Sequence, residues 1–215
     1  MTVNLQTQEI SKRYDSFTAL EPSTFALNSA QITILSGPNG SGKTTLLSCL
    51  SGIIQPTTGS ISVGGYDLFS SEVEARKRLA FVPDVPRFYL ELTAWEHLRF
   101  IAMANQALEG FENRAEDILR KLGLWKVRHH FPHHYSRGMR LKLGLALAFI
   151  RPFEVLLLDE PTSALDQDAV GTLIKELEAL RSREVSVLLS THDPNLLKQI
   201  GDRQLVISDG RVEEQ

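Results

Sequence analysis

The chain has 215 residues, a length at which one well-buried core is expected, with or without a smaller lobe. Its content of 42% hydrophobic and 23% charged residues is typical of a globular protein and excludes disordered, collagen-like and disulfide-scaffold classes. A net charge of -3 provides no strongly basic surface, so we expect no nucleic-acid partner.

Neither cysteine content nor hydropathy points to an exported or membrane-spanning chain. Cys49 is the single cysteine, which fits a reducing compartment, and it lies in an apolar segment where core packing is expected. Residues 1–10 lack the apolar stretch of a signal peptide. The most apolar region, residues 141–158, is interrupted by charges and Pro152 before it reaches the ~18 residues that span a bilayer. Any membrane role therefore requires a partner chain.

In chain order, the first elements suggest two kinds of β-structure. Residues 1–30 show the apolar alternation of antiparallel strands, which predicts a small β-layer beside the main core. Residues 31–36 form an apolar strand, and a helix is expected to begin at Lys43.

Between that strand and that helix lies a glycine-rich segment of the pattern G-x-x-x-x-G-K-[ST]. Its residues are Gly37, Pro38, Asn39, Gly40, Ser41, Gly42, Lys43 and Thr44. Glycines let the backbone approach phosphate oxygens, the amides of the loop and helix N-terminus donate to them, Lys43 neutralises charge, and the Thr44 hydroxyl can bind Mg²⁺. The alternative is a glycine-rich turn without a ligand, but a Lys-Thr pair at a helix start has no folding advantage. The segment predicts a nucleoside triphosphate site.

The later elements complete an α/β pattern. Residues 93–123 show helical periodicity without a strand, which predicts a helical lobe. Strands are expected at 155–159, 185–190 and 204–208, with a helix from Asp166 between the first two. This alternation predicts a largely parallel central sheet.

The strand at 155–159 ends in two acids, Asp159 and Glu160. Ligands of open α/β sheets bind at the carboxyl ends of strands, so both carboxylates should face the phosphates. Asp159 is placed to hold Mg²⁺, and Glu160 to act as general base toward water, which favours hydrolysis. A polar cap on a core strand and a small-molecule kinase are the alternatives, but the sequence shows no Arg-rich lid.

Together these motifs resemble, in order and spacing, the nucleotide-binding domains of ABC transporters. The resemblance rests on residues 37–45, which include Thr45, on 136–140, 156–161 and 163–166, and on His192. It covers nearly the whole chain and implies one domain over residues 1–215. That domain would have a P-loop core, a mostly parallel sheet, an antiparallel N-terminal layer and a helical lobe at about 86–150.

The segment at 136–140 departs from the family signature Leu-Ser-Gly-Gly-Gln. Ser136 and Gly138 match, whereas Arg137 replaces a glycine and Tyr135 and Met139 replace Leu and Gln. A hydroxyl and free amides at a helix N-terminus can form an anion site, although an ordinary Ser N-cap explains the same residues. The resemblance implies that Ser136, Arg137 and Gly138 contact the nucleotide of a second subunit, in a head-to-tail dimer with itself or with a relative.

The resemblance assigns four further positions. Tyr14 matches the aromatic that stacks on adenine, and Asp84 replaces the Gln that touches Mg²⁺, a change that adds a negative charge. Asp166 matches the D-loop at the dimer contact, and His192 the switch histidine beside the γ-phosphate. A surface tyrosine, a helix N-cap and a strand-end histidine are the alternatives for Tyr14, Asp166 and His192. The metal set would be Thr44, Asp84 and Asp159.

The function implied is an ATP-hydrolysing subunit that uses ATP and Mg²⁺ and powers a separate transmembrane permease from the inner face of the membrane. The Ser-Arg-Gly-Met-Arg form is most similar to bacterial exporter-type subunits, and residues 86–93 would face the permease or pack in the lobe. A soluble ABC ATPase acting on DNA, ribosomes or protein assembly is the alternative, though it usually carries extensions that are absent here. The histidines at 129, 130, 133 and 134 fit an exposed loop better than a metal site.

Overall fold

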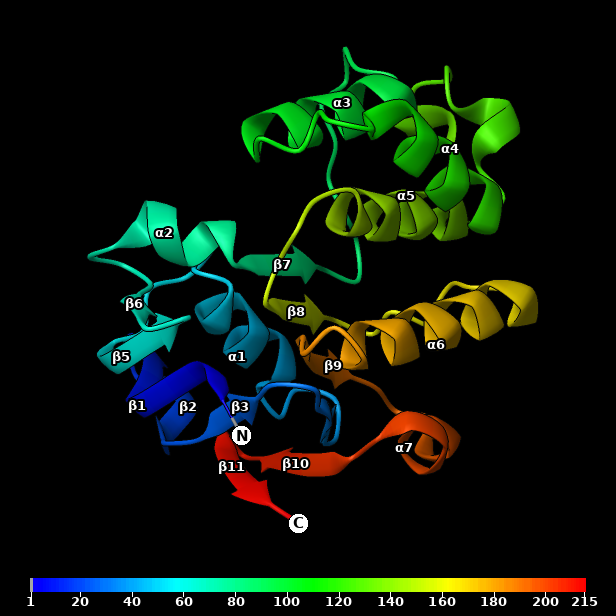
Figure 1. The fold of residues 1–215 in the computed structure, drawn as a ribbon. Coiled ribbons are helices and arrows are strands. Elements are labelled where there is room, and N and C mark those ends of the chain that lie inside the picture. The colour runs from blue at the N-terminus through cyan, green and yellow to red at the C-terminus, as the bar shows by residue number, and fades with distance from the viewer. Residues whose placement is uncertain (1) are drawn as a thin grey trace. The chain divides into compact units, whose positions relative to one another are not determined.

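A computed structural model describes residues 2–215, which fall into two compact units (Figure 1). Unit 1 consists of the residues through Phe81, Phe153–Glu160 and Glu176–Gln215. Unit 2 consists of Val82–Pro152 and Pro161–Lys175.

The main sheet of unit 1 has the strand order β11-β10-β4-β9-β8-β7. Its strands are β4 (Ile32–Ser36), β7 (Leu79–Val82), β8 (Val155–Leu158), β9 (Ser186–Ser190), β10 (Arg203–Ser208) and β11 (Arg211–Glu214). The four strands β10, β4, β9 and β8 pair in parallel, and β11 pairs antiparallel to β10. β8 and β9 are buried along their whole length, as expected of strands in a covered parallel sheet. The expected α/β architecture is confirmed.

A second, antiparallel sheet of unit 1 runs in the order β2-β1-β5-β6, with β3 paired to β1. Its strands are β1 (Val3–Tyr14), β2 (Phe17–Ser23), β3 (Ala26–Asn28), β5 (Thr58–Val63) and β6 (Tyr66–Asp67). The N-terminal β-layer is thus confirmed. The sequence patterns did not predict β5 and β6.

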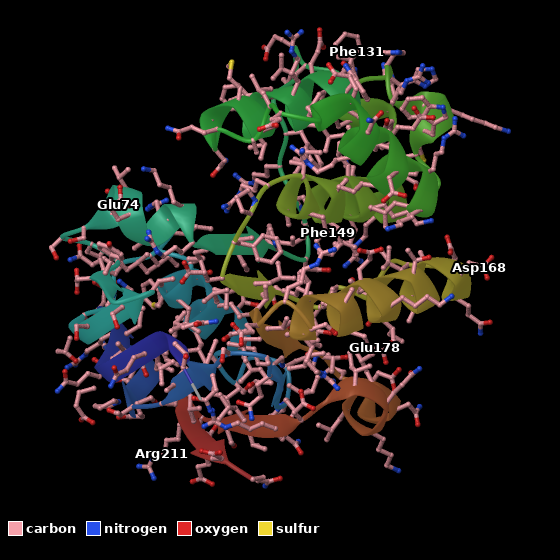
Figure 2. All side chains as sticks on the ribbon, viewed as in Figure 1. Glu74, Phe131, Phe149, Asp168, Glu178 and Arg211 are labelled. Carbon is pink, nitrogen blue, oxygen red and sulfur yellow. The ribbon has the colours of Figure 1, made fainter. Side chains whose placement is uncertain are left out.

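Helix α1 (Lys43–Leu50) packs into the same core as these strands. Leu46, Leu47, Cys49 and Leu50 are fully buried beside Leu5 and other strand residues, so Cys49 is a core residue as expected. Burial raises the pKa of the Cys49 thiol to about 11. Unit 1 also contains the short helices α2 (Glu72–Lys77) and α7 (Pro194–Ile200), and Glu74 on α2 projects outward (Figure 2).

Unit 2 is helical. It contains α3 (Ala94–Ala104), α4 (Phe111–Lys121), the short turns η1 (Trp125–Val127) and η2 (Pro132–His134), α5 (Arg137–Phe149) and the first half of α6 (Gln167–Arg181). A capping box between Thr93 and Glu96 starts α3, and Trp95 packs edge-on against Phe111. Among residues 2–215, no helix combines the length and apolarity needed to cross a bilayer.

The four histidines of the segment before α5 are exposed, as is Phe131, which is labelled in Figure 2. Within the described part of the chain, His, Cys, Asp and Glu side chains form no group of three or more that could hold a metal ion.

Candidate active site

The glycine-rich loop connects β4 to α1, as the sequence predicts. Gly42 is the N-cap of α1 and has a φ of 110°, and a Cβ there would lie 2.7 Å from the Ala19 carbonyl oxygen. Only glycine fits that conformation and that gap. Because the cap has no side chain, the first-turn amides of α1 remain available to an anion, which the helix dipole also attracts.

Lys43 is nearly buried, and its ammonium group donates to the carbonyl oxygens of Gly37 and Pro38 at 2.8 and 3.0 Å. The loop therefore curls around its own lysine. Phosphate oxygens are stronger acceptors than neutral carbonyls for an ammonium donor, so a triphosphate could take over these bonds.

Thr44 and Asp159 meet in this loop region. The Thr44 hydroxyl donates to Asp159 Oδ2 at 2.9 Å, and Asp159 is 3% exposed. A hydroxyl and a carboxylate are hard oxygen donors of the kind that Mg²⁺ prefers. The pair fits the predicted metal position.

Ser190, the last residue of β9, joins the two acids. Its hydroxyl donates to Asp159 Oδ1 at 2.7 Å and accepts the Glu160 backbone N–H at 2.8 Å. The Ser190 side chain is fully buried. Sequence reasoning missed this residue, because a serine within an apolar strand has no motif of its own.

Glu160 has a φ of 47°, an unfavourable backbone conformation for a residue with a side chain. Its carboxylate lies 2.9 Å from Nε2 of His192. The side chain of Glu160 is 20% exposed and that of His192 is 48% exposed. The predicted base and the predicted switch histidine are thus brought together at the ends of β8 and β9.

These groups share one cavity of about 240 Å³ in unit 1. It is lined by Phe17, Ala19, Asn39, Gly40, Gly42, Lys43, Thr44, Thr45, Asp159, Glu160 and His192. An ammonium group, a hydroxyl, two carboxylates and an imidazole therefore face a space where phosphate and water can meet, as phosphoryl transfer requires.

Tyr14 is not among the residues that line this cavity, whereas Phe17 is. The two face each other across the β1–β2 turn, where Phe17 is 63% exposed and Lys12 lies over the Tyr14 ring at 5.0 Å. Adenine stacking on Tyr14 stays a prediction. Phe17 is a second candidate for stacking on adenine, and its position three residues after Tyr14 in the same hairpin is a signal that the sequence offers.

The signature candidates lie in unit 2. Ser136 is the N-cap of α5 and accepts the Met139 N–H, as expected of an ordinary serine N-cap. Asp166 likewise accepts the Ala169 N–H at the start of α6 and pairs with Lys142 at 2.7 Å. The Lys142 hydrogen bond is the main reason that the pKa of Asp166 is lowered.

Asp84 lies in the same unit as these residues, and its carboxylate contacts Arg137 and Ser163. Its expected contact with Mg²⁺ stays a prediction.

Comparison with known proteins decides the family. The family model described as "ABC transporter" matches residues 20–163, which is more than half of the chain. The chain belongs to the ABC transporter family. It is an ATP-binding subunit of this family and an ATPase.

Relatives of this ABC chain match it over nearly its full length. The SkfA peptide export ATP-binding protein SkfE of Bacillus subtilis is 31% identical over 97% of this chain and 87% of the relative. The bacitracin transport ATP-binding protein BcrA of Bacillus licheniformis is 29% identical over 100% of this chain and 70% of the relative.

Solved structures show the same fold. An ATP-binding subunit of an ABC transporter superimposes with a TM-score of 0.94 at 32% identity and covers 100% of this chain and 90% of its own. A dimeric bacterial ABC transporter cassette gives a TM-score of 0.89 at 24% identity, over 98% of this chain and 97% of its own. These likenesses confirm the ABC ATPase fold.

Proposed function

We propose that this subunit powers export through a separate membrane-spanning chain and acts at the cytoplasmic face of the membrane. One relative supports the direction, since the name of SkfE assigns it to SkfA peptide export, and the name of BcrA assigns that relative to bacitracin transport. The cavity of unit 1 supports the energy source, because it gathers the groups that phosphoryl transfer requires.

ATP binding would use the glycine-rich loop. The first-turn amides of α1 donate to phosphate oxygens, and the Lys43 ammonium exchanges its two loop carbonyls for them. Thr44 and Asp159 would hold Mg²⁺, whose charge favours the phosphates in the bound state. Thr45, Phe17 and Tyr14 complete the candidates for nucleotide contact.

Hydrolysis would use Glu160 as the general base. The carboxylate takes a proton from a water molecule while the water oxygen bonds to the γ-phosphorus. The bond from that phosphorus to the bridging oxygen breaks, and ADP and phosphate leave. His192, 2.9 Å from Glu160, is placed to orient the carboxylate and the water.

The working unit would be a head-to-tail dimer, with this chain or a relative as its partner. Ser136, Arg137 and Gly138 at the start of α5 would contact the nucleotide of the second subunit, with Asp166 at the contact between the two. Solved cassettes of this fold that are themselves dimeric support the arrangement. Closure with ATP and reopening after hydrolysis would drive the membrane chain.

The segment before α3 would contact that membrane chain. Val85, Tyr89 and Leu90 are 57, 60 and 67% exposed, an unusual concentration of apolar side chains for a free surface. The buried His97 ring fixes this segment, because its Nε2 accepts the Tyr89 N–H at 2.9 Å.

One observation carries the proposal: Glu160 and His192 lie in the same cavity as Lys43, Thr44 and Asp159. The test is Glu160→Gln, which should bind ATP, lose about 100-fold or more in turnover and accumulate as an ATP-bound dimer. Lys43→Ala is the control that should lose ATP binding itself. Turnover retained in Glu160→Gln would exclude this residue as the base.

The partner is tested separately. The chain, tagged and expressed in its native host, should purify from gently solubilised membranes with a multi-span protein in stoichiometric amount. If a ribosomal, DNA-bound or wholly soluble partner purified with the chain instead, the assignment as an ATPase would stand and the proposed role in transport would be refuted.

A further inference from the structure

Two residues that depart from the family pattern, Asp84 in place of the Gln near Mg²⁺ and Arg137 in place of a signature glycine, contact each other. Arg137 Nη2 donates to Asp84 Oδ1 at 2.7 Å and to Oδ2 at 2.9 Å. Ser163 Oγ donates to the same Asp84 Oδ1 at 2.7 Å and lies 3.3 Å from Arg137 Nη2. All three residues belong to unit 2. The extra negative charge at position 84 is therefore matched by the extra positive charge at position 137.

The rest of this region is packed more firmly. A Cβ on Gly138 would lie 2.5 Å from the Ala164 carbonyl oxygen, so the start of α5 rests directly on the backbone of the segment before α6. Lys142, whose side chain is 16% exposed, ties α5 to Asp166 at 2.7 Å. The segment that follows β7 also packs on α5, since a Cβ on Gly144 of α5 would lie 2.8 Å from Pro86 Cγ. The Asp84–Arg137 pair adds an exposed polar connection between the two.

That connection is accessible to a competing anion. The side chains of Arg137 and Asp84 are 53 and 35% exposed. Exposed ion pairs contribute little to stability, and a guanidinium group binds phosphate oxygens with a geometry that suits its planar fork. A triphosphate, with several charges, would attract Arg137 more strongly than one carboxylate does.

We propose that Asp84 is the counter-ion that holds Arg137 in the free subunit, and that the triphosphate bound to a second copy displaces it. Arg137 then bonds to phosphate, and the segment that carries Asp84, Tyr89 and Leu90 loses its ion pair with α5, while the packing of Pro86 on α5 remains. ATP bound in the second copy is thereby linked to the surface of Val85, Tyr89 and Leu90, which we propose faces the membrane chain. This inference rests on the proposed head-to-tail dimer.

The exchange predicts how each residue affects ATP-dependent dimerisation. Asp84→Asn removes the carboxylate that competes with phosphate for Arg137. The free energy of one exposed ion pair corresponds to about 2–5-fold tighter dimerisation per site, so the dimer dissociation constant should fall about 4–25-fold for two sites. Arg137→Gln should weaken the dimer. The double variant should dimerise like Arg137→Gln, because without the Arg137 guanidinium group Asp84 has no partner to hold away from the phosphate.

The measurement is sedimentation velocity with ATP and Mg²⁺ over a protein dilution series, with Glu160→Gln as the common background to suppress turnover. Glu116→Gln, which neutralises the acid of an exposed pair with Arg120 on α4, is the matched control and should leave dimerisation unchanged. Melting temperatures report any general loss of structure in each variant.

Tightening by Asp84→Asn that disappears in the double variant supports the exchange. A weaker dimer with Asp84→Asn would instead indicate a direct Asp84 contact with Mg²⁺ and overturn the exchange, as would an unchanged dimer. If the Glu160→Gln background forms no dimer with ATP, the proposed head-to-tail function fails, and the exchange fails with it.

Discussion

Removal of the Ser190 hydroxyl tests whether the two acids depend on a common support. Ser190→Ala leaves Asp159 Oδ1 without this donor and the Glu160 N–H without this acceptor. One bond is to a charged group and one to a neutral amide, so the expected loss of stability is about 2–4 kcal/mol. A looser Glu160 also raises the barrier to hydrolysis, and each ~1.4 kcal/mol is tenfold in rate, so kcat should fall about 10–100-fold.

Ser186→Ala is the matched control in the same strand. Ser186 is also fully buried, and its hydroxyl donates to the Asn28 carbonyl oxygen at 2.6 Å, away from the acids. Ser186→Ala should lower the free energy of unfolding by about 1 kcal/mol and leave kcat unchanged. Urea unfolding gives the stabilities, and phosphate release at saturating ATP and Mg²⁺ gives kcat. If Ser190→Ala kept kcat within about twofold of the parent, as the control does, the support role would be refuted.

Three further outcomes concern stability, each measured by urea unfolding. Burial lowers the pKa of His97, so the folded state favours neutral imidazole, and stability should fall as pH drops below about 6.5, by at most about 1.4 kcal/mol per unit. His97→Gln should remove this dependence of stability on pH, and an unchanged dependence would show that another group causes it. Thr93→Ala removes the capping box with Glu96 and should cost about 1 kcal/mol, whereas no loss would mean the cap is replaceable. Gly171→Ala in α6 should add about 0.5–1 kcal/mol, because the new methyl group has no atom within 4 Å; a loss would indicate a hidden contact.

The elements that local patterns define were predictable. The strand expected at 155–159 is β8 at Val155–Leu158, and the helix expected from Lys43 begins there. Apolar runs, glycine positions and charged strand ends act within a few residues, so their effect is visible in the sequence. β5 was not predictable in this way, because its Thr-Gly-Ser start is weakly apolar and its place depends on pairing with β1.

The connections within the candidate site were less predictable than its motifs. Ser190 contacts Asp159 across 31 positions, and Arg137 contacts Asp84 across 53. The first contact depends on the parallel register that sets Leu158 opposite Leu189, and the second on how α5 packs in unit 2. Each departure from the family pattern was visible alone, but the pairing of one with the other requires the fold.

The position of β9 between β4 and β8 fixes the spacing of the site. Neighbouring strands lie about 4.8 Å apart, so the strand that enters the glycine-rich loop and the strand that carries the acids are held about 10 Å apart. Backbone hydrogen bonds set this gap, and core side chains can therefore change over evolution while the gap stays constant. The same arrangement makes β9 intolerant of insertion, because a slip of one residue would turn Ser190 to the opposite face of the sheet.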